Sequence, residues 1–131
     1  MRLSLAIVTL LLLVLLSGCG TAGSERDARG SVERFFAAFK AHDGAGACRE
    51  LSTETVSQVE SAEKKPCPKG ILSEQVSPAP VTGVKVYMQS AQAKLAGGEA
   101  VFLDQTDQGW KISAVGCKPQ SGKPYQCELE S

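Results

Sequence analysis

The sequence lacks several features that would point directly to a class of function. It has no excess of either charge, because 14 Lys and Arg residues balance 14 Asp and Glu residues. A nucleic-acid-binding protein usually presents a basic surface that neutralises phosphates, so this balance argues against one. Charged residues nevertheless make up 21% of the chain and hydrophobic residues 43%, and this composition excludes wholesale disorder.

Groups that bind metals or perform catalysis are also scarce. His42 is the only histidine, and no Cys-x-x-Cys pair occurs among the five cysteines. No nucleophile and base, and no glycine-rich phosphate loop, can be assembled from the remaining residues. We therefore expect no metal site, no cofactor and no catalytic residue.

The one long hydrophobic run lies at the N-terminus. Thirteen of the first 18 residues are hydrophobic, and Arg2 is the only charged residue among them. The run over residues 5–16 is shorter than the roughly 20 residues that cross a bilayer core, so it is typical of a signal peptide. Removal of residues 1–18 leaves 113 residues with 13 basic and 14 acidic side chains, a length that suits one domain with a modest core.

Small residues lead from this run directly into a cysteine. The segment Leu16-Ser17-Gly18-Cys19 resembles the lipobox of bacterial lipoproteins. The resemblance implies cleavage between Gly18 and Cys19 and a diacylglyceryl lipid on Cys19, and two acyl chains are enough for stable anchoring. It places the protein at the outer face of the cytoplasmic membrane, with residues 19–27 as lipid anchor and tether. An ordinary secretory signal that happens to end near a cysteine is the alternative.

The four cysteines that remain form an even set in an oxidising compartment, where structural disulfides are common. Four cysteines allow three connectivities. Proximity along the chain favours Cys48–Cys67 and Cys117–Cys127. Each bridge would contribute about 3 kcal/mol by the loop-entropy model. A zinc site is the alternative, and the missing Cys-x-x-Cys spacing argues against it.

Residues 28–131 are predicted to form one α+β domain. Val32, Phe35, Phe36 and Phe39 recur at helical spacing after a predicted N-cap at Ser24, so they form one apolar face of a long helix. This face is expected to be core. Two further helices are predicted after the N-caps Asp43 and Ser52. The segment 66–70 with its two prolines should break the second of them, and one more helical turn is expected over 71–76 before Pro78 and Pro80.

The hydrophobic period changes in the second half of the chain. Val84, Val86 and Met88 alternate with polar residues, which predicts a strand with one buried face. Further strands are predicted over 91–96, 100–105, 110–115 and 125–129, with turns at 97–98 and 107–109. Helices followed by an antiparallel meander predict helices packed on one face of a curved sheet.

The order of these elements resembles the NTF2-like (SnoaL-like, cystatin-like) α+β family. The resemblance is carried by the aromatic-rich helix 32–43, the Ala-rich segment 44–51 and the Gly-Trp-Lys-Ile segment at 109–112, and the absence of Asn fits an actinobacterial lipoprotein of this type. It implies a cone between helices and sheet. Its core or cavity would be lined by Phe35, Phe36, Phe39, Val84, Val86, Met88, Trp110 and Ile112.

Two functions remain open at this point. The first is a non-enzymatic, lipid-anchored binding or accessory domain for an envelope protein or a small apolar ligand, with no nucleic-acid partner. The second is a small enzyme or lipid carrier that uses the cone interior, with Asp104 or Tyr87 as its polar groups. His42, at an expected helix end, is predicted to be exposed. The shape and polarity of the interior decide between these hypotheses.

Overall fold

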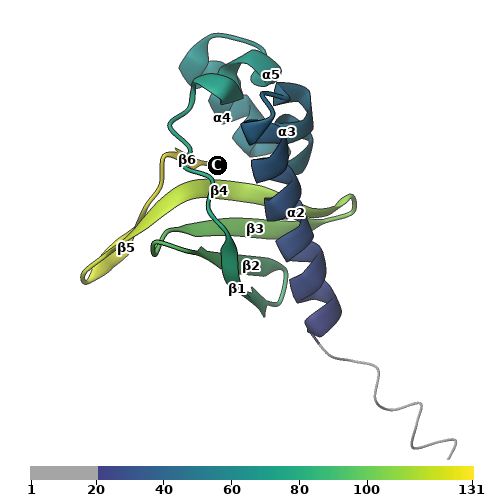
Figure 1. Cartoon of the computed structure of the whole chain (residues 1–131), viewed down its shortest axis with the longest axis vertical. Helices are drawn as coiled ribbons and strands as arrows, with labels where there is room; N and C mark the ends of the chain where they lie inside the picture. Colours follow the sequence, from purple (N-terminus) through teal and green to yellow (C-terminus); the bar gives the residue numbers. More distant parts are fainter. Residues whose placement is uncertain (1–20) are drawn as a thin grey trace, which may run out of the picture.

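The computed structural model describes residues 21–131 as an α+β domain. In this range four α-helices precede a six-stranded antiparallel sheet, which confirms the predicted fold class (Figure 1). The helical elements are α2 (Ala22–Lys40), α3 (Gly44–Glu50), α4 (Thr53–Glu63), α5 (Cys67–Gly70) and the 3-10 turn η1 (Ile71–Ser73). The strands are β1 (Val81–Tyr87), β2 (Ser90–Leu95), β3 (Ala100–Thr106), β4 (Gly109–Gln120), β5 (Lys123–Gln126) and β6 (Leu129–Glu130).

The predicted helix starts are correct where a side chain caps the helix. Asp43 accepts a hydrogen bond from the Gly46 amide at 2.9 Å, and Ser52 accepts one from the Thr55 amide at 3.1 Å. These bonds satisfy amides that have no partner inside the helix. In the described residues α2 already begins at Ala22, so the prediction of an N-cap at Ser24 is wrong.

The predicted break of the third helix is present, because α4 ends at Glu63, but residues 67–70 then form the short helix α5. The further helical turn expected over 71–76 is present as η1. Pro68 lies in the first turn of α5, where a missing N–H costs nothing because that position has no helical acceptor. Gly44, at the start of α3, allows this helix to pack directly on α5. A Cβ atom at position 44 would overlap the Pro68 carbonyl group.

The main hydrophobic core lies between the helices and one face of the sheet, called here the inner face. The helix α2 lies across this face (Figure 1). Its predicted apolar stripe is turned inward, because the stripe residues belong to the main core. Phe35 and Val32 are fully buried, Phe36 is 5% exposed, and Phe39 is partly buried against the same cluster. The sheet contributes Ala91, Ala93, Leu95, Val101, Leu103, Trp110, Ile112 and Val115.

The strand β4 organises the sheet because three different segments pair with its second edge. The order is β1-β2-β3-β4-β5, with β6 also paired to β4. Leu51 forms a bridge to Ile112, β6 pairs with residues 114–115, and β5 pairs beyond them with residues 118–120. The helical layer and the C-terminal segment are therefore both tied to one strand.

A bulge in β4 bends the sheet. Phe102 pairs with Ala114 and Leu103 pairs with Ile112, so Ser113 is an extra residue on β4. Bulges of this kind increase strand twist and redirect the strand beyond them. Gly116 then adopts a φ of +68°, and a Cβ atom there would meet the Glu128 side chain at 2.8 Å. Beyond this point β4 and β5 form an arm that extends past the rest of the sheet (Figure 1).

The prediction that Met88 faces the core is wrong. Val84 and Val86 pack against the core as expected, but β1 ends at Tyr87, which pairs with Ser90. Met88 therefore lies in a two-residue turn with a φ of +57°, and its side chain is 93% exposed. The alternation of apolar residues stops at the turn because the chain reverses there.

Candidate functional site

The space between helices and sheet is filled by side chains. Phe35, Ile71, Leu103 and Ile112 are all fully buried at its centre, and Phe35 packs against Phe36 with ring centroids 5.5 Å apart. Such a packed interior resembles an ordinary protein core and leaves no room for a ligand of useful size among these residues.

The interior of the described domain also holds no unsatisfied polar side chain. Within residues 21–131, every buried side-chain nitrogen or oxygen has a hydrogen-bond partner. The two polar groups that an interior enzyme or carrier would need lie elsewhere. Tyr87 is 57% exposed, and Asp104 is exposed on the opposite face of the sheet. The hypothesis of a site inside the cone thus loses the residues on which it depended.

A second, smaller apolar cluster lies on the opposite face of the sheet, called here the outer face. Its buried members are Ala100, Ala114 and Cys117, and Phe102, Tyr125 and Cys127 pack against them. The rings of Phe102 and Tyr125 meet edge to face with centroids 5.2 Å apart. This arrangement is favourable for aromatic pairs and fixes the β5 segment against β3.

An open groove of about 370 Å³ lies beside this cluster and is called here the outer-face groove. Phe102 and Ala114 come from the central strands, and Tyr125 comes from the arm. Its volume is within the range of small-ligand and side-chain binding sites. The complete lining is Phe102, Asp104, Ser113, Ala114, Pro124, Tyr125, Cys127, Glu130 and Ser131.

Polar groups surround the apolar floor of the outer-face groove. The carboxylates of Asp104 and Glu130 lie on its rim, and the Tyr125 hydroxyl accepts a hydrogen bond from the Gln92 side-chain amide at 3.0 Å. Ser90 donates to Asp104 at 2.8 Å. The groove therefore combines aromatic surface with acidic acceptors, which suits an apolar group that carries a hydrogen-bond donor or a cation.

The two predicted disulfides are both present. Cys48–Cys67 joins α3 to α5, and Cys117–Cys127 joins β4 to the segment after β5. The first bridge belongs to the helical layer. The second closes the base of the arm, and because Cys127 also lines the outer-face groove, it fixes one wall of that groove.

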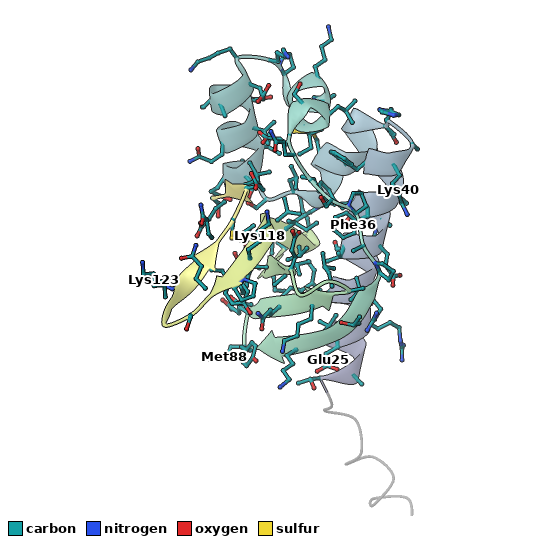
Figure 2. All side chains as sticks on the ribbon, turned by 60° about the vertical axis from the view of Figure 1, so that its left-hand side comes forward. Glu25, Phe36, Lys40, Met88, Lys118 and Lys123 are labelled. Atoms are coloured by element: carbon teal, nitrogen blue, oxygen red, sulfur yellow. A yellow bond between two sulfur atoms is a disulfide. The ribbon has the colours of Figure 1, made fainter. Side chains whose placement is uncertain are left out.

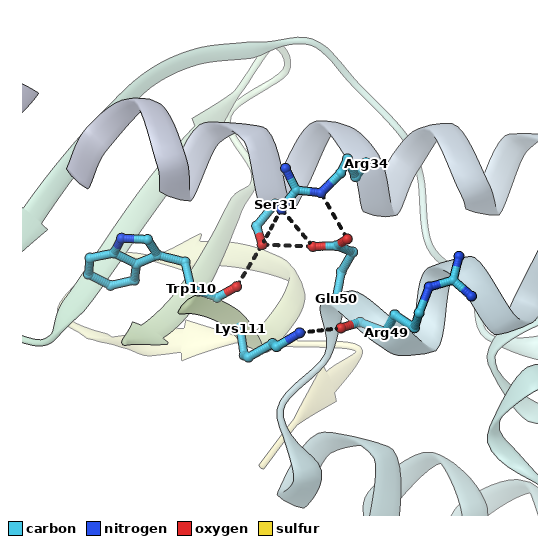
Figure 3. A network of polar contacts seen from close by, with 6 residues as sticks. All are labelled: Ser31, Arg34, Arg49, Glu50, Trp110 and Lys111. Atoms are coloured by element: carbon cyan, nitrogen blue, oxygen red, sulfur yellow. Dashed lines mark hydrogen bonds and ion pairs between the residues drawn. The ribbon is translucent and has the colours of Figure 1, made fainter. Parts of the chain in front are cut away.

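A polar network joins α2, α3 and β4 at the edge of the sheet (Figure 3). Arg34 contacts both carboxylate oxygens of Glu50, at 2.9 and 3.1 Å. The Ser31 hydroxyl lies 2.8 Å from Glu50 and 2.6 Å from the Trp110 carbonyl oxygen, and it can donate to one of them at a time. Lys111 donates to the Arg49 carbonyl oxygen at 2.6 Å. The carboxylate of Glu50 is thereby fully engaged.

This network ties α2 and α3 to β4 and keeps the Glu50 carboxylate ionised. Burial alone would raise the pKa of Glu50, but hydrogen bonds from Arg34 and Ser31 and the charges of Arg34 and Lys111 outweigh it and lower that pKa. A general base at neutral pH needs the opposite shift. Glu74 behaves differently, because burial and repulsion from Glu63 and Glu128 raise its pKa.

Several predicted features lie outside the described residues. These are the signal peptide 1–18, the cleavage site at Gly18 and the lipid acceptor Cys19. In the part of the chain that the structure describes, no helix is both long and apolar enough to cross a bilayer. Residues 21–131 also contain no group of His, Cys, Asp or Glu side chains that could hold a metal ion.

The sequence did not reveal the outer-face groove. Phe102 alternates with the buried Val101 and Leu103, so the sequence pattern places it on the opposite face of the sheet. Ala114 and Tyr125 join Phe102 only because of the bulge in β4 and the path of the arm, which the sequence pattern does not show. Comparisons with protein-family models, with curated proteins and with solved structures found no match to this chain. The function must therefore be inferred from the geometry of the site.

Proposed function

We propose that this chain is a lipid-anchored cell-envelope protein with an NTF2-like domain that acts by binding and not by catalysis. The observation that carries the proposal is the contrast between the two faces of the sheet. The inner face is filled and its polar groups are satisfied, whereas the outer face carries an accessible groove with an aromatic floor.

The chemistry of the outer-face groove supports a binding role. Phe102 and Tyr125 supply flat apolar surface, and Asp104 and Glu130 supply acceptors on the rim. An arginine side chain of an envelope protein would suit both the apolar surface and the acceptors, because it combines an apolar stem with a cationic, donor-bearing head. The Cys117–Cys127 bridge holds the groove wall in place before binding, which reduces the entropy lost on association.

Lipid anchoring is supported by the lipobox-like Leu16–Cys19 segment and by an even set of disulfide-bonded cysteines after Cys19 is set aside. Metabolic labelling with a fatty-acid analogue tests it. The wild-type chain should be labelled and the Cys19→Ala variant should not. Equal labelling of both chains would show that the lipid is attached to a residue other than Cys19.

The binding role is tested by placing a photo-crosslinking amino acid at position 102 in the full chain, in cells. The matched control is position 57, because Ser57 is exposed on α4 and bonds only to the Thr53 carbonyl oxygen. A discrete adduct from position 102 that Asp104→Lys abolishes, with none from position 57, supports the groove as the binding site. Equal adducts from both positions contradict it.

A further inference from the structure

Two large hydrophobic side chains of the described chain remain exposed, and they are neighbours. Tyr87 is 57% exposed and Met88 is 93% exposed. Together they form the end of the β1–β2 hairpin, called here the hairpin tip. Nothing within residues 21–131 covers them, and their positions at a turn give them no role in the core. Two adjacent apolar side chains form a small exposed patch, so its place in the molecule decides what it contacts.

The hairpin tip lies at the same end of the molecule as the start of α2. Figure 2 places Met88 and Glu25 at one end of the long axis, away from α4 and α5 at the other end in Figure 1. Val84 on β1 and Ala22 on α2 line the same surface hollow. Met88 follows Val84 by four residues, so it lies within about 13 Å of that hollow along an extended strand.

Covalent geometry brings the proposed lipid close to this end. Cys19 precedes Ala22, the first described residue of α2, by three positions. Three residues span at most about 11 Å. If Cys19 carries acyl chains inserted in a bilayer, the start of α2 is held near the lipid surface, and the hairpin tip is held near it too.

Charge at this end does not by itself select a membrane. Arg26 and Lys85 are exposed at this end, but Glu25 and Asp27 flank Arg26 on α2. Asp104 adds a further negative charge, since it accepts a hydrogen bond from Ser90 at the start of β2. The favourable free energy of membrane contact must then come from the apolar side chains. An unbranched methionine and an amphipathic tyrosine are suited to the boundary between headgroups and acyl chains.

We propose that Tyr87 and Met88 rest in the lipid interface of the membrane to which Cys19 is anchored. The proposal depends on the lipid anchoring proposed above. One anchor alone leaves a domain free to rotate about its tether, whereas a second contact at the hairpin tip fixes its orientation. The α4–α5 end then points away from the membrane, and the outer-face groove opens to the side.

The experiment uses the processed, lipidated chain reconstituted into phosphatidylcholine vesicles. One additional cysteine at position 88, Met88→Cys, is the only free thiol of the processed chain and carries an environment-sensitive fluorophore. The matched control is Lys64→Cys, because Lys64 is also exposed, also has a positive φ of 53°, and lies at the end of α4. Intact mass must show two disulfides in each variant.

The expected result is a blue shift and a several-fold rise in fluorescence at position 88, with quenching by lipids that carry a spin label near the headgroup. Position 64 should show neither effect. Identical spectra at both positions overturn the proposal. A shift at position 88 without lipid quenching also overturns it, because a protein neighbour then covers the tip.

Failure of the anchor is distinguishable from failure of the contact. If the processed chain does not float with vesicles, the lipid on Cys19 is absent and both proposals fall. If it floats and position 88 remains in water, lipid anchoring stands and the contact of the hairpin tip is rejected. Met88→Asp in the floating chain provides a second check, since it should abolish the quenching of a probe placed at position 89.

Discussion

The largest fully buried side chains of the sheet lie on the inner face, whereas the residues fully buried on the outer face are small, and the roles proposed for the two faces differ in the same way. The inner face buries large side chains, including Leu103, Trp110 and Ile112, against the aromatic stripe of α2. The buried members of the outer cluster are Ala100, Ala114 and Cys117. Large residues fill the space that they enclose, whereas the small residues buried on the outer face leave a groove beside the rings of Phe102 and Tyr125.

The two disulfides follow the same division. Cys48–Cys67 lies in the helical layer that covers the inner face, and Cys117–Cys127 lies at the base of the arm that walls the outer-face groove. If the two faces have separate roles, substitutions that disrupt the inner face should unfold the domain. Substitutions that disrupt the outer face should release the arm and leave the remaining structure in place.

The largest expected effect is that of Phe35→Ala. Phe35 is fully buried and contacts the rings of Phe36 and Phe39, so its removal leaves a cavity in a filled core. The free energy of unfolding should fall by about 3–5 kcal/mol, as urea denaturation can measure. Phe102→Ala on the outer face is the control and should cost only about 1 kcal/mol, since Phe102 is partly exposed. Equal losses would contradict the comparison.

Removal of the inner-layer disulfide should have the next largest effect. The bridge Cys48–Cys67 closes a loop with a sequence separation of 19, and the double variant Cys48→Ala/Cys67→Ala should lose about 3 kcal/mol by the loop-entropy model. Because α3 packs on α5 and on α2, hydrogen exchange should increase throughout the domain. Faster exchange confined to residues 44–70 would show that the helical layer unfolds separately from the sheet.

Removal of the arm disulfide should change a smaller region. The loop closed by Cys117–Cys127 has a sequence separation of 10, so the same model gives slightly less than about 3 kcal/mol. Cys117→Ala/Cys127→Ala should accelerate hydrogen exchange over residues 117–131 and leave β1 to β3 protected. Crosslinking from position 102 should be lost with the groove wall. A domain-wide increase in exchange would mean that the arm is part of the main folding unit.

The features that obey a local rule were predictable, and those that depend on the path of the chain were not. Helical spacing identified Phe35 and Phe36 as core, and proximity identified both disulfides. Alternation failed at Met88, because a strand pattern carries no information about where the chain turns. The groove combines Phe102 of β3 with Tyr125 of the arm beyond the bulge at Ser113, and no residue type in that stretch predicts a bulge.

The smallest expected effects concern the carboxylates of the helical layer. The pKa of Glu50 is lowered in the folded state, so its contribution to stability is present above the unfolded pKa and is lost as pH falls through the folded one. Glu50→Gln should therefore cost about 1 kcal/mol at neutral pH, a modest value because Arg34 is exposed, and progressively less in acid. Glu33→Gln is the control, since Glu33 is exposed and its ion pair with Arg29 is long, at 3.9 Å.

Glu74 should behave in the opposite direction. Burial, together with repulsion from Glu63 and Glu128, raises its pKa, so the folded state favours the protonated carboxyl. The stability that this group contributes is present below its unfolded pKa and is lost as pH rises through the folded one. Glu74→Gln should then raise the free energy of unfolding slightly at neutral pH and change it little in acid. If urea denaturation shows both glutamine variants losing stability at neutral pH, repulsion around Glu74 is not the dominant influence on it.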